Sequence, residues 1–209
     1  MRPAALLSPL IPALLIAIAC DEPTGRSSHA PPCPEGALDQ PARTDAIVAL
    51  LGSVPEGAAL LEATRARMGR VCFAPEGPNA IDADLTLVLD RALSDGEAAA
   101  RVGHLLVHAR DGLPYVDAPP GTDCDARVAH ALDREAEAHA VELDLRRALG
   151  VGGSRLVFPF EAAFQSAPSH ERVALVRRWL EEHPDGAPGL DGLATGYRMR
   201  CERERAGAP

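Results

Sequence analysis

The chain has 209 residues, and its 30 Asp and Glu residues outnumber its 21 Lys and Arg residues to give a net charge of −9. A protein that binds nucleic acid needs a basic face that releases counterions from phosphates, so this charge argues against a nucleic-acid partner. The length suffices for one domain with a sizeable core.

The chain begins with a short apolar segment that ends in a cysteine. Arg2 gives the segment a positive end, residues 4–19 are apolar, and Ala17 to Ala19 place small residues before Cys20. The run contains two prolines and is shorter than the roughly 20 residues of a membrane-spanning helix. It resembles a bacterial lipoprotein signal peptide, which implies cleavage after residues 1–19 and lipid on Cys20. We therefore expect a protein held by lipid at a membrane of the bacterial cell envelope, with ordinary secretion as the alternative.

The next residues set the expected domain limits. Residues 20–40 are rich in Pro, Gly, Ser and acids and lack apolar periodicity, which predicts a flexible tether. A single domain is expected over residues 41–203, followed by a tail over residues 204–209. With Cys20 lipidated, four of the five cysteines remain, and an even number in an exported protein favours two disulfides over metal thiolates. The sequence does not choose among the three pairings of Cys33, Cys72, Cys124 and Cys201.

The first half of the domain is expected to hold two helices and two strands. Thr44 can cap a helix through Leu51, and Pro55 opens a second helix that runs to Met68. Apolar runs predict strands over residues 70–74 and 85–89, which can pair as a small sheet.

The second half is expected to be helical. Ser94 and Glu97 have the spacing of a capping box, so a helix is predicted from there to Asp111. A turn-rich loop leads to the longest helix, over residues 123–149. A loop with three phenylalanines expected in the core follows, and then come helices over residues 169–182 and 190–203.

Two histidines on the first of these long helices suggest a metal site. His104 and His108 are four residues apart, so both imidazoles lie on one helix face and can aim at one point. The same spacing also arises in helices whose histidines are only packed and hydrogen-bonded. The surrounding sequence has to distinguish the two interpretations.

The order of the parts resembles the gluzincin metallopeptidases, in which an edge strand precedes an HExxH helix and a second helix carries an ExxAD-like motif. Residues 103–109, Gly-His-Leu-Leu-Val-His-Ala, match the zinc helix at both histidines. Residues 135–140, Glu-Ala-Glu-Ala-His-Ala, match ExxADA at the glutamate and both alanines. Residues 85–90 stand for the edge strand, and the resemblance spans residues 71–149. It implies an α+β, mainly helical zincin-like domain, stapled by disulfides, with zinc on His104, His108 and Glu135.

Two departures from the family pattern change the expected function. Leu105 occupies the position of the HExxH glutamate, the base that takes a proton from zinc-bound water, and leucine cannot do this. His139 replaces the family's aspartate, so orientation of the first histidine by that carboxylate is lost. Because His139 lies one turn beyond Glu135, it can become a fourth ligand and close the site. Glu137 as a substitute base is disfavoured because it points off the face of Glu135.

The sequence therefore predicts a membrane-anchored pseudoenzyme that holds zinc and acts by binding a protein or peptide. Two alternatives stay open. One is a working zinc metallopeptidase with an unrecognised base, and the other is a metal-free structural lipoprotein of the envelope.

Overall fold

The computed structural model describes residues 32–115, 122–152, 155–187 and 190–207. The expected signal peptide and Cys20 lie outside these ranges. None of the helices within them is both long and apolar enough to cross a membrane. The described part is a mixed α+β fold with a small sheet and two disulfides.

Four short strands form the main sheet, in the order β1-β2-β4-β3. The strands β2 (Val71–Ala74) and β4 (Leu87–Asp90) pair in parallel, as the two predicted strands were expected to pair. β1 (Leu38–Asp39) and β3 (Ala80–Ile81) add antiparallel strands at the two edges. The expectation that residues 85–90 form the edge strand is wrong, because β3 covers β4.

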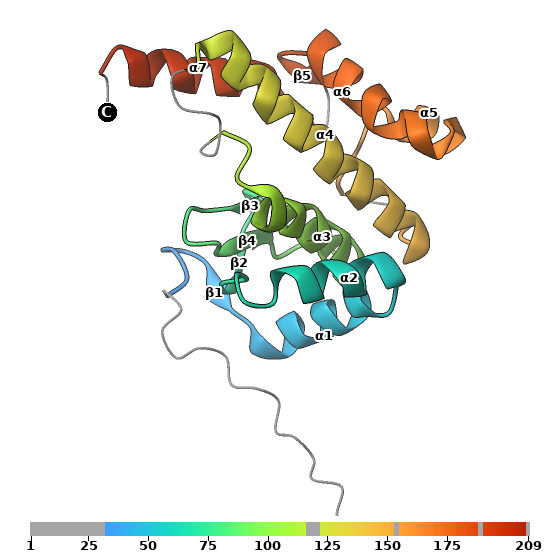
Figure 1. Ribbon diagram of the computed structural model, residues 1–209. Coiled ribbons are helices and arrows are strands. Elements are labelled where there is room, and N and C mark those ends of the chain that lie inside the picture. The colour runs from blue at the N-terminus through green and yellow to red at the C-terminus, as the bar shows by residue number, and fades with distance from the viewer. Residues whose placement is uncertain (1–31, 116–121, 153–154, 188–189, 208–209) are drawn as a thin grey trace, which may run out of the picture. The chain divides into compact units, whose positions relative to one another are not determined.

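Three helices pack around this sheet: α1 (Pro41–Gly52), α2 (Pro55–Thr64) and α3 (Asp95–Asp111). α3 begins with the predicted capping box, in which Ser94 and Glu97 satisfy each other's backbone N–H groups. It contacts α1, α2, β3 and β4 and is buried along almost its whole length (Figure 1). The apolar side chains of these elements form one core, which includes Ile47, Leu51, Phe73, Leu89 and Leu106.

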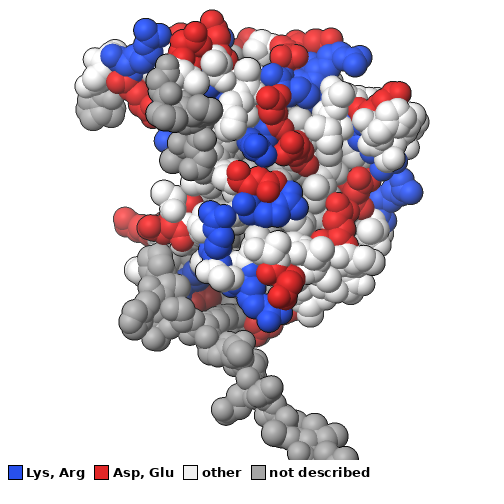
Figure 2. Space-filling view, in the orientation of Figure 1, with Lys and Arg blue, Asp and Glu red and all other residues white. Residues whose placement is uncertain are grey.

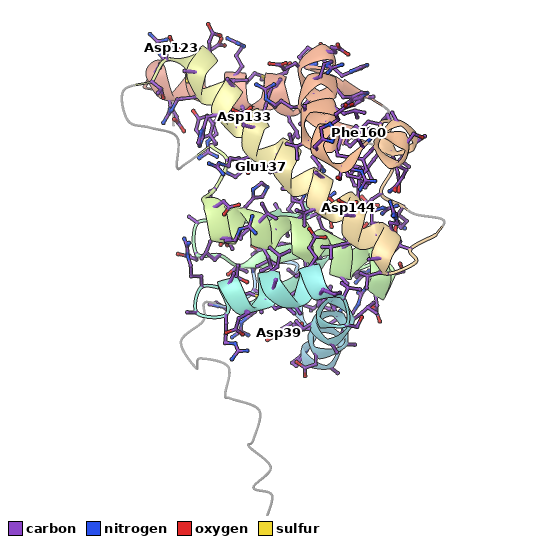
Figure 3. All side chains as sticks on the ribbon, turned by 45° about the vertical axis from the view of Figure 1, so that its right-hand side comes forward. Asp39, Asp123, Asp133, Glu137, Asp144 and Phe160 are labelled. Atoms are coloured by element: carbon purple, nitrogen blue, oxygen red, sulfur yellow. A yellow bond between two sulfur atoms is a disulfide. The ribbon has the colours of Figure 1, made fainter. Side chains whose placement is uncertain are left out.

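The rest of the chain packs against α4 (Cys124–Ala148), the longest helix. It comprises α5 (Glu161–Ser166), the 3₁₀ turn Ser169–Glu171, α6 (Arg172–Glu182), the β5 (Gly186–Ala187) and β6 (Leu190–Asp191) hairpin, and α7 (Leu193–Arg205). A second core between α4 and these elements holds the three phenylalanines, as expected, with Phe160 labelled in Figure 3. α4 thus has α3 on one side and α6 and α7 on the other (Figure 1).

Two disulfides join the four cysteines of the domain as Cys33–Cys72 and Cys124–Cys201. The first disulfide and strand β1 attach residues 33–39 to the sheet, so the folded part begins before the expected limit at residue 41. At the other end, Glu204 belongs to α7 and accepts a hydrogen bond from the Tyr115 hydroxyl. The helical part of the domain therefore extends beyond residue 203, where it was expected to end.

Charged side chains of both signs are interspersed on the face drawn in Figure 2. Ion pairs attach α6 to α4, with Arg177 Nε 2.6 Å from Asp133 Oδ1 and Arg172 Nη1 2.6 Å from Asp144 Oδ1. Both pairs are partly exposed, and ion pairs at the protein surface contribute about 0–1 kcal/mol each. The apolar contacts of the second core therefore hold these helices together.

Candidate metal centre

The close packing of α3 on α4 brings the four predicted ligands together. Gly103 makes this approach possible, because a Cβ atom there would lie 2.1 Å from Cδ1 of Leu145 on α4. The next residue, His104, faces α4, and His108 follows one turn later. The side chains of His104, His108, Glu135 and His139 are all buried.

Three of these residues form a compact triangle of donor atoms. The Nε2 atoms of His104 and His108 are 3.1 Å apart, and Oε2 of Glu135 lies 3.4 Å from the first and 3.6 Å from the second. A triangle with these sides has its corners about 2.0 Å from a common centre, the length of a zinc–nitrogen or zinc–oxygen bond. One ion can therefore contact all three atoms without a rearrangement of the helices.

His139 joins the same group from α4. Its Nε2 atom is 3.9 Å from Oε2 of Glu135, and ligand atoms of His104, Glu135 and His139 lie within 4.8 Å of one another. These three residues could hold a metal ion. The Nε2 atoms of the three predicted histidine ligands thus all lie within 4 Å of Oε2 of Glu135, the fourth predicted ligand.

Glu142 supplies the orienting carboxylate that the sequence suggested was lost. Its Oε2 atom lies 3.1 Å from Nδ1 of His104 and 3.5 Å from Nδ1 of His139, although neither contact is aligned as a hydrogen bond. A carboxylate beside Nδ1 favours the proton on that nitrogen and leaves the Nε2 lone pair for a metal. Glu142 is seven residues after Glu135, two turns along one face of α4, and this spacing could have revealed it.

Two further residues complete the surroundings of the ligands. Nε of Arg101, one turn before His104, lies 3.2 Å from Oε1 of Glu142. The Tyr197 hydroxyl on α7 donates a hydrogen bond of 2.5 Å to Oε1 of Glu135. No local sequence pattern points to Tyr197, because it is 62 residues from Glu135.

The charges of the site suit a cation. Burial raises the pKa of the Glu135 carboxyl, but His108 and His104 outweigh burial and hold that pKa well below its ordinary value. Burial also opposes ionisation of Glu142, whose pKa is nevertheless depressed by Arg101 and the neighbouring histidines. Two ionised carboxylates are therefore buried beside Arg101 and the imidazoles, and a divalent cation could take the place of a proton on His104 in compensating their charge.

The imidazoles differ in their protonation. Burial lowers the pKa of His108, and it lowers the pKa of His139 to about 4. Burial and Arg101 also act to lower the pKa of His104, but the nearby carboxylates of Glu135 and Glu142 outweigh them and raise that pKa. A metal ion binding here would displace a proton shared with His104, as is general when ligands must lose protons.

A cavity of about 550 Å³ adjoins the ligands and is lined also by β3 and by Tyr197. Leu105, the residue after His104, also lines this cavity with an apolar side chain. Glu137 lies on α4, between Asp133 and Asp144 in Figure 3, and its half-exposed side chain pairs with Arg134. The structure thus places Glu137 apart from the ligands, as the helix geometry predicted.

A scan against models of protein families, a search of curated proteins and a search of solved structures each found no match to this chain.

Proposed function

We propose that this protein is a lipid-anchored protein of the bacterial envelope whose domain binds zinc and does not hydrolyse peptides. The triangle of His104, His108 and Glu135 donor atoms is the observation that carries the metal site. Imidazole and carboxylate ligands at tetrahedral spacing are typical of zinc. The gluzincin resemblance supports the proposal, because a small sheet, an HxxxH helix and a Glu-bearing helix follow one another in the chain.

Two features favour binding over hydrolysis. His139 offers a fourth ligand, and a zinc ion with four protein ligands keeps no open position for water. Leu105 cannot accept the proton that hydrolysis requires. The zinc ion would then hold α3 to α4, and the domain would act by binding a protein or peptide at the envelope.

Metal analysis of protein purified without an affinity tag tests the metal site. We expect about one zinc ion per chain, and at least a tenfold loss of zinc affinity in His108→Ala. The matched control is His170→Ala, because His170 is exposed and its nearest charged partner is its neighbour Glu171. Wild-type protein that binds no zinc after dialysis against it would support the metal-free structural alternative.

A second candidate function, peptide hydrolysis, is favoured by the cavity beside the ligands. Asp82 and Asp191 line this cavity, and Asp82 already accepts hydrogen bonds from the backbone N–H groups of Asp84 and Thr86. Asp191 is therefore the carboxylate to test first as a substitute base. Chelator-sensitive cleavage of a peptide library by the wild type, lost in Asp191→Asn, would establish hydrolysis. Activity that appears only in Leu105→Glu would support the pseudoenzyme.

The anchor is tested separately in bacterial cells. Labelling with a radioactive fatty acid should mark the wild-type protein and not Cys20→Ser, and only the wild type should enter a detergent phase. Release of unlabelled wild-type protein into the medium or periplasm would instead indicate ordinary secretion.

A further inference from the structure

α7 is attached to α4 at two points on one of its faces. Cys201 forms a disulfide with Cys124, the first residue of α4. Tyr197 is four residues before Cys201 and hence on the same face of α7. Its hydroxyl donates a hydrogen bond to Glu135, in the middle of α4. The disulfide is thus one helical turn from the residue that contacts a candidate ligand.

We propose that Tyr197 is a positioning residue for the metal ion and that the Cys124–Cys201 disulfide keeps it in place. This inference rests on the proposed metal site. The Tyr197 hydroxyl occupies Oε1 of Glu135, so the carboxylate presents only Oε2 to the ion. Reduction of the disulfide would then weaken metal binding without any change in the ligands.

The two carboxylate oxygens of Glu135 have different partners, and this difference supports the positioning role of Tyr197. Oε2 of Glu135 is the oxygen that lies near Nε2 of His104, His108 and His139. Oε1 accepts the Tyr197 hydrogen bond. A carboxylate that lacks this bond is free to rotate and to offer both oxygens to an ion. The hydroxyl therefore sets how Glu135 binds as well as where it lies.

The Tyr197 ring itself is held in a fixed orientation. It stacks on Tyr115 with ring centres 5.9 Å apart and planes within 6° of parallel. The guanidinium groups of Arg127 and Arg200 lie 4.9 Å and 4.3 Å from the Tyr115 ring centre. Cation–π contacts of this kind contribute about 0.5–1 kcal/mol each at exposed sites. The stack extends the link from the disulfide, since Tyr115, Cys124 and Cys201 are buried together.

Zinc affinity of Tyr197→Phe is the decisive measurement. The variant keeps the ring and its stacking and loses only the hydroxyl. We expect its zinc affinity to fall about 10–100-fold, as is usual when the outer partner of a metal ligand is removed. With Co²⁺ in place of zinc, the visible absorption bands should also change, because Glu135 would bind differently. The matched control is Tyr115→Phe, whose hydroxyl contacts Glu204 and Arg127 and not a ligand.

The outcomes separate this inference from the proposed function. Wild-type protein that binds no metal would refute the proposed site, and the inference with it. Wild-type protein that binds zinc no more tightly than Tyr197→Phe, with identical Co²⁺ spectra, would refute the positioning role alone. A fall in thermal stability without a fall in affinity would show that the hydroxyl is only structural.

The disulfide is tested with paired double variants. Cys124→Ala/Cys201→Ala should bind zinc more weakly than the wild type, whereas Cys33→Ala/Cys72→Ala should bind with wild-type affinity. Both variants lose a disulfide, so both are expected to be less stable, and circular dichroism checks that each is folded. Equal zinc affinity in the two folded variants would contradict the role of the Cys124–Cys201 disulfide. If either fails to fold, the Tyr197→Phe comparison still decides the positioning role.

Discussion

A single buried carboxylate, Glu142, lies beside Nδ1 of both His104 and His139, the two histidines that face each other across the contact of α3 with α4. It is fully buried, and burying an unpaired carboxylate costs several kcal/mol. The residue is retained beside Arg101, His104 and His139, where its charge is compensated. A carboxylate three positions after His139 on α4 therefore lies beside both of these imidazoles.

We predict that Glu142→Gln lowers zinc affinity about 10–100-fold, because the amide orients the Nδ1–H groups less strongly than a carboxylate does. The apo protein should also lose stability, since Arg101 would be buried without its anionic partner. Isothermal titration with zinc and chemical denaturation measure the two effects. Glu137→Gln on the same helix is the control and should leave both values unchanged, because its side chain is half exposed. Equal losses in the two variants would argue against a specific role of Glu142.

At the scale of elements, the site depends on how closely α3 approaches α4. Gly103 lies where a side chain would collide with the fully buried Leu145, so the contact requires the smallest residue. Glycine in a helix interior costs about 1 kcal/mol relative to alanine. The close packing that this glycine allows brings candidate ligands from two helices near one point.

Gly103→Ala should therefore destabilise the protein, although alanine favours helix. Overpacking of this kind costs about 1–3 kcal/mol, more than the helix propensity returns. Zinc affinity should fall as well, because separating α3 from α4 moves His104 away from Glu135. Thermal denaturation and zinc titration check this, with Gly152→Ala as the control because a Cβ atom there meets nothing within 4 Å. Unchanged affinity in Gly103→Ala would show that α3 tolerates a shift.

At the scale of the whole molecule, the candidate site connects two cores. The candidate ligands His104 and His108 lie on α3, which packs in the core around the main sheet. The candidate ligands Glu135 and His139 lie on α4, which also packs against α6 and α7 in the second core. An ion bound between α3 and α4 would join the two sides. Its binding free energy would therefore add to the stability of the entire domain.

We predict that chelation lowers the melting temperature of the zinc-loaded protein. With free zinc at a thousand times its Kd, binding stabilises the folded state by about 4 kcal/mol, which corresponds to roughly 10 °C for a domain of this size. Differential scanning calorimetry with and without chelator measures the shift. His108→Ala should show a smaller shift at the same zinc concentration, because its affinity for zinc is lower. A wild-type melting temperature that is insensitive to zinc and chelator would contradict a metal that joins the two cores.

The Cys33–Cys72 disulfide acts on stability at the same scale. It closes a segment of 39 residues between the start of the domain and β2, so it restricts the unfolded chain. Replacing both cysteines with alanine should lower the free energy of unfolding by about 2–5 kcal/mol. Urea denaturation measures this loss. A change below about 1 kcal/mol would show that β1 and α1 hold the N-terminal segment without the disulfide.

Local chemistry in the sequence was enough to predict the parts of the site. The Ser94 and Glu97 pair predicted the start of α3, because a capping box acts within one helical turn. The helical period of about 3.6 residues placed His104 and His108 on one face of α3. The order of the motifs along the chain predicted that Glu135 and His139 lie near them. Two disulfides were also predicted, from the four cysteines that remain without Cys20 and from the expectation that the protein is exported.

Only the tertiary structure decided what surrounds these parts. Strand β3 has two residues, too few for a sequence pattern, and it exists because it pairs with β4. Tyr197 reaches Glu135 from a distant helix, and the cysteine partners were fixed by which helices and strands pack together. Short-range hydrogen bonds and helical periodicity depend on residues close together in the sequence, so the sequence predicts them. Contacts between distant segments depend on how the whole core is packed, so only the tertiary structure shows them.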